Sequence, residues 1–355
     1  MGRAERAAPL GAGKLLVLLA LVALLVVFRA AAAAPQAGTV KPAPRPGSLT
    51  LGSCLACHAD KGGYQDDVHA QKGFGCTACH GGDASVEDLG AMSPARGFRG
   101  KITGPRIPEL CASCHSDANF MKNYAPQMRV DQLALYRTSM HGRKLAAGQT
   151  RVATCIDCHG VHGIRPVSDP RSAAFPIHQP ETCGRCHTGV ERKEYEQSVH
   201  WELLSRNREL SAPACATCHG SHGATPPNVS SVVNVCGTCH VFLEELFQKS
   251  PHAPAFRSAG LRGCVECHGN HRVLRTNDGM VGDQSGSVCR NCHAPGDPGL
   301  KVARELSDRL GELKADLALG ERVVHQAEVY GMEVSDARME IGAADQALVQ
   351  ARVLV

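Results

Sequence analysis

Residues 155–162 read CIDCHGVH, and the same pattern returns as CATCHGSH at residues 215–222 and as CVECHGNH at residues 264–271. Its first five residues form C-x-x-C-H, the sequence at which c-type haem is attached to a protein. The two thiols lie about one helical turn apart, so each can add to one vinyl group of a porphyrin. The adjacent His then lies under the iron as its proximal ligand. The pattern therefore predicts a chain that folds around covalently bound haem.

The unit C-x-x-C-H occurs nine times and uses all 18 Cys of the chain. Paired thiols could instead hold zinc, act as redox dithiols or form disulfides, but none of these roles requires His directly after the second Cys. The sequence therefore predicts nine haem c groups, each bound through two Cys and one proximal His. We number the units sites 1 to 9 in chain order: Cys54, Cys57 and His58; Cys76, Cys79 and His80; Cys111, Cys114 and His115; Cys155, Cys158 and His159; Cys183, Cys186 and His187; Cys215, Cys218 and His219; Cys236, Cys239 and His240; Cys264, Cys267 and His268; Cys289, Cys292 and His293.

The nine remaining His are candidates for the sixth, distal ligand of an iron. His162, His222 and His271 each lie three residues after a proximal His, which is too close to reach the opposite face of their own haem. If they bind iron, each binds the iron of a neighbouring haem and holds two haems together. The other candidates are four His that precede a site in related positions, and two that follow no repeat: His69, His141, His200 and His252; His178 and His325. A thioether is the alternative ligand, from Met92, Met121, Met128 or Met140.

An internal repeat of two sites occupies residues 131–297. Each copy reads Ser-x-His, then C-x-x-C-H-G-x-H, then C-x-x-C-H. The proximal His of the second unit recurs at positions 187, 240 and 293, a spacing of 53 residues twice. Residues 51–130 form a divergent front section of three sites, in which Gly81-Gly82 replaces the Gly-x-His extension. We expect residues 51–297 to form one nine-haem cytochrome domain.

The composition leaves little material for an ordinary core. Aromatic residues make up only 4% of the chain, and the segment from Leu51 to His293 offers about 27 residues per site. Short apolar runs are interrupted by Gly and Pro. We therefore expect a mainly α and irregular fold, in which short helices and loops wrap around stacked haems with almost no sheet.

Residues 298–355 differ from the rest, because they lack Cys and carry apolar residues at spacings of three and four. This pattern predicts two helices that meet near Gly331 and form a C-terminal helical hairpin. The pattern runs to Val355 without a capping residue, which suggests that the natural chain extends further.

The N-terminal residues predict export. Residues 1–34 join a basic start to an apolar run of 14 residues and to small residues, as in a secretory signal peptide. Such a run is short for a membrane span, which needs about 20 residues, although an uncleaved anchor is the alternative. Residues 35–50 contain four Pro and are predicted to be a linker. We expect a periplasmic or cell-surface protein rather than one anchored in the inner membrane.

These residues resemble the multihaem c-type cytochromes with doubled C-x-x-C-H motifs, the broad cytochrome c3-like group. The resemblance covers residues 54–293 and is most specific in residues 139–187 and their later copies. It implies an electron carrier of the periplasm or outer surface of Gram-negative bacteria, with mostly bis-His irons and with donor and acceptor proteins as partners. By this resemblance, the distal positions are matched by His141, His162, His200, His222, His252 and His271. The front section lacks the second distal His.

The number of His favours an electron carrier. Nine further His suffice to give every iron six ligands, which leaves no position for a substrate and no catalytic residue. The alternative is an oxidoreductase in which one haem keeps an open position and acts on a small nitrogen or sulfur species such as nitrite or hydroxylamine. No unit ends in Lys, which marks one such active site. A third alternative is a structural or filament-forming subunit.

The net charge of +4, counted with neutral His, is too small to indicate binding to nucleic acid or to an anionic membrane. We therefore expect redox proteins as partners, with the membrane reached only through an N-terminal anchor. The helical tail is most simply a packing element or a contact between copies of the chain in a homo-oligomer.

Overall fold

The computed structural model describes residues 52–226, 231 and 234–354. The chain divides into two compact units, residues 1–43 and 44–355, and all described residues belong to the second. The predicted signal segment (1–34) and the predicted linker (35–50) lie outside the described residues.

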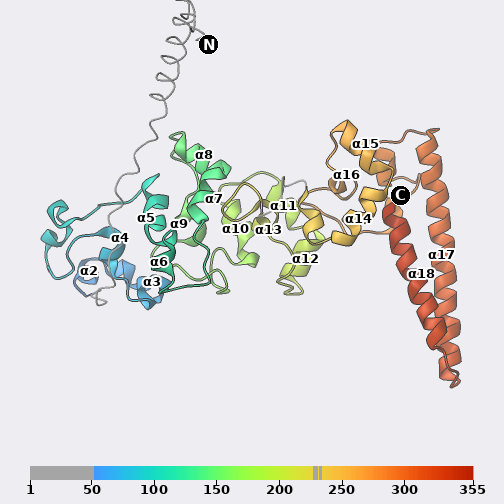
Figure 1. Cartoon of the computed structure of the whole chain (residues 1–355), viewed down its shortest axis with the longest axis horizontal. Coiled ribbons are helices and arrows are strands. Elements are labelled where there is room, and N and C mark those ends of the chain that lie inside the picture. Colours follow the sequence, from blue (N-terminus) through green and yellow to red (C-terminus); the bar gives the residue numbers. More distant parts are fainter. Residues whose placement is uncertain (1–51, 227–230, 232–233, 355) are drawn as a thin grey trace, which may run out of the picture. The chain divides into compact units, whose positions relative to one another are not determined.

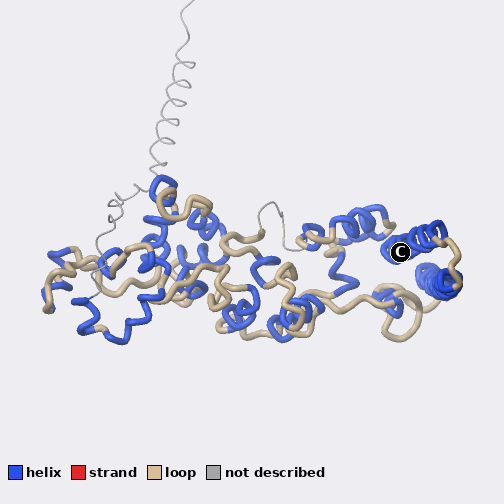
Figure 2. The backbone as a smooth tube through the Cα atoms, turned by 90° about the horizontal axis from the view of Figure 1, so that it is seen from below, coloured by secondary structure: helices blue, strands red, loops and turns tan. Residues whose placement is uncertain are grey.

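Within the described ranges, the backbone forms helices and loops and contains no strand (Figure 2). This confirms the predicted fold class. The α-helices are α2 (Gly52–Cys57), α3 (Val68–Gln71), α4 (Cys76–His80), α5 (Arg106–His115), α6 (Ala118–Met121), α7 (Gln132–Thr138), α8 (Met140–Ala146), α9 (Cys155–His159), α10 (Gln179–Gly184), α11 (Glu191–Tyr195), α12 (Val199–Ser205), α13 (Cys215–His219), α14 (Val241–Lys249), α15 (His252–Ala259), α16 (Cys264–His268), α17 (Pro298–Val329) and α18 (Ser335–Leu354). The 3-10 helices are η1 (Ala59–Asp66), η2 (Leu89–Met92), η3 (Pro94–Arg96), η4 (Pro176–His178), η6 (Cys236–Thr238), η7 (Asp278–Met280) and η8 (Val288–Asn291).

Four of the C-x-x-C-H units are five-residue helices, α4, α9, α13 and α16, and each is followed directly by a Gly. At Gly160 the backbone has φ 81° and ψ −177°, a combination that only Gly adopts readily. The equivalent Gly81, Gly220 and Gly269 also have positive φ, between 68° and 77°. A Gly with this backbone conformation directly after the proximal His turns the chain away from the helix axis. Each helix therefore ends at its proximal His.

The short helices α8 and α12, which carry two of the Ser-x-His segments, are each capped by the Ser that precedes them. Ser139 caps α8 by accepting a hydrogen bond from the N–H of Gly142, and Ser198 caps α12 by accepting one from the N–H of Trp201. Both serines are buried. The cap holds the start of the helix rigidly, and the His two residues later projects from its first turn.

The buried side chains form only small groups. One cluster consists of Leu204, Ala212 and Ala214, with Trp201 and Leu203 packed against it. A fold of this length with an ordinary core would bury far more apolar surface. The interior of the described region is therefore built around something other than its own side chains.

The C-terminal residues form the predicted helical hairpin. Helices α17 and α18 lie side by side as the two long helices of Figure 1 and pack against each other. Pro298 occupies the first turn of α17, where its missing N–H costs nothing, and Asp297 caps that helix. Gly331, with φ 80°, lies in the turn between the two helices. This confirms the predicted hairpin and the break near Gly331.

The hairpin docks on the last part of the haem region. Helix α17 packs against η7 and η8, and α18 packs against α14. Its buried residues are Leu300, Ala303, Leu310 and Leu348. Asp278 in η7 pairs with Lys314 of α17 at 2.6 Å and with Arg352 of α18 at 2.5 Å. Of the helices that the structure describes, none has the length and hydropathy of a membrane span.

Candidate haem-binding site

A single continuous cavity of about 5040 Å³ runs through the described region. All 27 residues of the nine C-x-x-C-H units line it: both Cys and the His of every site. A pocket for one small organic ligand occupies about 300–1,000 Å³. The cavity is therefore large enough for several porphyrin-sized groups, and it explains why the side-chain core is so small.

Seven proximal His face a second imidazole across this cavity. An iron with two axial His holds each ligating nitrogen about 2 Å away, so the two ring centres lie about 6 Å apart. The observed centre-to-centre separations run from 5.8 to 6.3 Å. The pairs are His69 with His115 at 5.9 Å, His80 with His162 at 5.9 Å, His141 with His187 at 6.1 Å, His159 with His222 at 6.1 Å, His200 with His240 at 6.3 Å, His219 with His271 at 5.8 Å and His252 with His293 at 6.3 Å. These residues fit an iron porphyrin between the two rings of each pair.

The pairs follow one register along the chain. We define copies 1 to 4 as the two-site segments that contain sites 2 and 3, 4 and 5, 6 and 7, and 8 and 9. The His that precedes the first site of a copy faces the second site of the same copy: His69, His141, His200 and His252. The Gly-x-His residue faces the first site of the preceding copy instead: His162, His222 and His271. Sites 2 and 3 thus obey the same register as the three later copies.

Backbone hydrogen bonds between consecutive copies support this register. The N–H of Val68 donates to the carbonyl of Ile164 at 2.9 Å, and the N–H of Val199 donates to the carbonyl of Val273 at 2.8 Å. In both cases the acceptor lies two residues after the Gly-x-His residue of the next copy. That His itself has a left-handed backbone at positions 162 (φ 53°) and 271 (φ 55°), which is uncommon for a residue other than Gly. Such strain is typical of residues held in place for a ligand.

Asp67 contacts a candidate iron ligand, and the sequence pattern alone did not single it out. Its Oδ1 atom lies 2.9 Å from Nδ1 of His69, and its Oδ2 atom accepts hydrogen bonds from the N–H groups of Gly163 and Ile164 at 2.8 and 2.7 Å. A carboxylate on Nδ1 orients the ring and leaves the other ring nitrogen of His69 free for a metal. The repeat could have drawn attention to this residue, because Asp67 occupies the position of the Ser in the later Ser-x-His segments.

Two further carboxylates lie near ligand-type imidazoles. Asp297, the cap of α17, lies 3.2 Å from Nδ1 of His293, and Glu194 lies 3.9 Å from Nδ1 of His271. Through Asp297 the first turn of the hairpin is connected directly to site 9.

Burial shifts the imidazoles toward the neutral form that binds metal. Burial lowers the pKa of His115, and the neighbouring His69 and His159 lower it further. Burial is also the main cause of the lowered pKa of several other imidazoles in the cavity: His141, His159, His162, His200, His219, His222 and His268.

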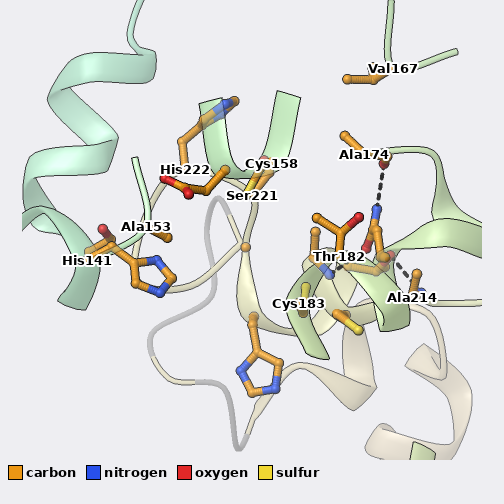
Figure 3. A pocket seen from close by; sticks show the side chains of 18 of the residues that line it. His141, Ala153, Cys158, Val167, Ala174, Thr182, Cys183, Ala214, Ser221 and His222 are labelled. Atoms are coloured by element: carbon orange, nitrogen blue, oxygen red, sulfur yellow. Dashed lines mark hydrogen bonds between the residues drawn. The ribbon is translucent and has the colours of Figure 1, made fainter. Parts of the chain in front are cut away.

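The thiols bring the sites into one row. The first Cys of one site reaches the first Cys of the next within hydrogen-bonding range for sites 1 and 2, 3 and 4, 5 and 6, and 7 and 8. For sites 2 and 3, 4 and 5, 6 and 7, and 8 and 9, a Cys of the later site lies close enough to raise the pKa of the second Cys of the earlier site. Figure 3 shows one such junction, where Cys158 of site 4 and Cys183 of site 5 lie in the same pocket as His141 and His222.

Four His lie outside the seven pairs, and all 18 His of the sequence are among the described residues. In the part of the chain that the structure describes, no second imidazole lies against His58 of site 1 or His268 of site 8. His178 lies with Nε2 2.9 Å from the carbonyl of Pro170. His325 lies on α17 with its side chain 74% exposed, near Glu328. The structure does not bring either of them to a proximal His.

The four Met residues named as alternative ligands, Met92, Met121, Met128 and Met140, all line the cavity. Met121 is buried, whereas Met128 and Met140 are exposed.

The family model described as cytochrome c3 matches residues 68–195 and 208–294, which include sites 2 to 9. The chain is also similar to the C-type polyheme cytochrome OmcC of Geobacter sulfurreducens, with 24% identity over 225 residues. That similarity covers 51% of this chain and 28% of the length of the relative. No solved structure matches the chain.

Proposed function

The chain belongs to the cytochrome c3 family of multihaem c-type cytochromes that transfer electrons, and we propose that it carries electrons along nine covalently attached haems. Each haem, when bound, can accept and release one electron at its iron. The two Cys of each site hold the porphyrin, and the proximal His holds the iron from one side.

The observation that carries this proposal is the set of seven facing imidazole pairs. The two imidazoles of each pair would together hold an iron from both sides, which would leave no position for a substrate there. Such a site suits electron transfer and not substrate turnover. The side chains around it then act on the reduction potential through burial and hydrogen bonds to the ligands.

The succession of thiol contacts supports a continuous route. Cys side chains of every two consecutive sites, from site 1 to site 9, lie close enough for one to shift the pKa of the other. Consecutive porphyrins attached to these thiols would be close neighbours. The role of the polypeptide is to hold them in this order and to keep water from much of their surface.

We place the protein in the periplasm or at the cell surface, with redox proteins as electron donor and acceptor. The support is the basic and apolar pattern of residues 1–34, which is that of an export signal. We also propose that this segment is cleaved during export.

Electron paramagnetic resonance of the oxidised, natively matured protein tests this function. We expect low-spin ferric signals from at least seven haems per chain, and stepwise reduction of these signals in a potentiometric titration. Fewer than seven low-spin haems would contradict the assignment of the imidazole pairs.

An oxidoreductase is the second candidate, because His58 and His268 have no facing imidazole among the described residues. An iron held by one His keeps a position at which a small molecule can bind. Substrate turnover would then be confined to site 1 or site 8, with the other seven sites supplying electrons.

A further inference from the structure

The ligand register gives a rule for the first site of each copy. Site 2 faces His162, site 4 faces His222 and site 6 faces His271, so in each case the second imidazole comes from the Gly-x-His of the following copy. The three ring separations, 5.9, 6.1 and 5.8 Å, agree closely. Site 8 is the first site of copy 4, so the rule requires a Gly-x-His after residue 293 for it. Residues 294–355 contain none.

The His residues nearest to site 8 in the sequence are already engaged. His271 lies only three residues after His268, but its ring lies 5.8 Å from that of His219 in site 6. His252 lies 6.3 Å from His293 in site 9. His240 is close enough to lower the pKa of His268, but it is the proximal residue of site 7 and faces His200.

The two remaining His are held elsewhere. The Nε2 atom of His178, a ligating atom of imidazole, lies 2.9 Å from the Pro170 carbonyl. The side chain of His325 is 74% exposed on α17. The hairpin side chains that line the cavity are aliphatic except for Lys314 and Arg352, and both of these pair with Asp278.

We propose that the iron at site 8 binds a small external ligand with a nitrogen or carbon donor atom, such as imidazole, cyanide or, when reduced, carbon monoxide. The inference rests on the proposed function, since it requires a haem on Cys264 and Cys267. At site 8 such a ligand would not have to displace any imidazole of the described residues, whereas at the seven paired sites it would. Site 1 lies before copy 1 and outside the register, so the rule does not apply to it.

The test is a titration of the full, haem-loaded chain with cyanide when oxidised and with carbon monoxide when reduced, followed by absorbance. We expect at least one ligand per chain to bind at low concentration. Replacing both Cys of site 8 (Cys264→Ala with Cys267→Ala) should lower that number by one. The matched change at site 1 (Cys54→Ala with Cys57→Ala) should leave at least one binding haem.

Three single variants provide the controls. His271→Ala should add one binding haem, because site 6 loses its second imidazole. His178→Ala and His325→Ala should leave the number unchanged. A new binding haem in either of these two variants would overturn the proposal if it disappeared when Cys264→Ala and Cys267→Ala were added, because that His would then have been a ligand of the iron at site 8.

The proposal would also be overturned if the unmodified chain bound no ligand, if the site 8 variant bound as many as the unmodified chain, or if the site 1 variant bound none. The site 1 variant and the three single variants keep the test valid if the site 8 variant does not fold. Nine low-spin haems with no ligand binding would refute only this inference. Fewer than seven low-spin haems would refute the proposed function itself.

Discussion

The Nδ1 atom of His69 lies 2.9 Å from Oδ1 of Asp67, a carboxylate that is 1% exposed. Burial alone would raise the pKa of Asp67, but hydrogen bonds from His69 and from the backbone N–H groups of His69, Ile164 and Gly163 lower it overall. The residue is therefore a buried anion that contacts the imidazole facing site 3. The equivalent residues Ser139 and Ser198 donate to the Tyr136 and Tyr195 carbonyls and cap their helices, so copy 1 differs from copies 2 and 3 at this position.

We predict that Asp67 lowers the reduction potential of site 3. A carboxylate that accepts a hydrogen bond from the ligand ring makes the ring a stronger donor and favours ferric iron. In Asp67→Asn, one of the potentials in a spectroelectrochemical titration should rise by about 60 mV, which is a tenfold change for one electron.

Asp66→Asn is the matched control for this variant, because the Asp66 side chain is 74% exposed and contacts only the side chain of Arg165, at 3.8 Å. Its potentials should equal those of the unmodified protein. Equal potentials in both variants would show that Asp67 has no influence on the iron.

The second prediction concerns the imidazoles that connect copies. His222→Ala should remove the second ligand from site 4 and leave the thioether bonds intact. The haem count by mass spectrometry should stay the same, while one low-spin ferric signal is replaced by a high-spin signal. His222 lies three residues after His219 of site 6 in the sequence. If the variant alters site 6 instead of site 4, then His222 does not face the preceding copy and the register of imidazole pairs is incorrect.

The third prediction concerns the backbone after the proximal His. A Cβ atom at Gly160 would meet no protein atom within 4 Å, so Gly160→Ala tests the strained φ of 81° without a clash against the polypeptide. We expect a loss of about 1–3 kcal/mol in the free energy of unfolding, measured by denaturant titration of the haem-loaded protein.

Gly311→Ala provides the comparison, because Gly311 lies in the middle of α17 and also has open space around it. There Ala is the better helix former, by about 1 kcal/mol. The two substitutions should therefore shift stability in opposite directions, and a shift in the same direction would argue against backbone strain at Gly160.

The fourth prediction concerns the docking of the hairpin. The hydrogen bond from Lys314, together with that from Arg352, lowers the pKa of Asp278 below its usual value of 3.8. Because the folded pKa is lowered, this contribution to stability is fully present above 3.8 and is lost as the pH falls through the lower folded value. Partly exposed pairs contribute little, so we expect about 1 kcal/mol from the two together.

Asp278→Asn should remove that contribution at neutral pH. Hydrogen exchange should become faster in α18 and in the part of α17 around Lys314, and unchanged in α9. Asp345→Asn, a change at an exposed position of α18, should have no effect on exchange. Equal rates for the two variants at neutral pH would show that Asp278 does not hold the hairpin.

Much of this architecture could be predicted from the sequence, because it depends on local chemistry. The C-x-x-C-H spacing and the following Gly require only a few consecutive residues, and the stripe of residues 298–355 with Gly331 in its middle predicts the hairpin. The lack of aromatic residues indicates that the core is not built from side chains.

The pairing of imidazoles could not be predicted in the same way. Which proximal His faces His162 depends on how copies stack, and the sequence spacing allows several neighbours. The interactions of Asp67 and His178 arise from contacts with residues 163–164 and with the Pro170 carbonyl, which only the folded backbone brings into place. His325 lies on α17, and its side chain is exposed because it lies on a face of that helix that the hairpin does not bury.

The central claim is that nine porphyrins are covalently attached to this polypeptide. The most direct measurement is the intact mass of the natively matured chain under denaturing conditions, compared with the mass of its polypeptide. We expect an increase equal to nine haem groups. The mass of the bare polypeptide, or an increase of fewer than nine haems in a fully matured sample, would contradict it.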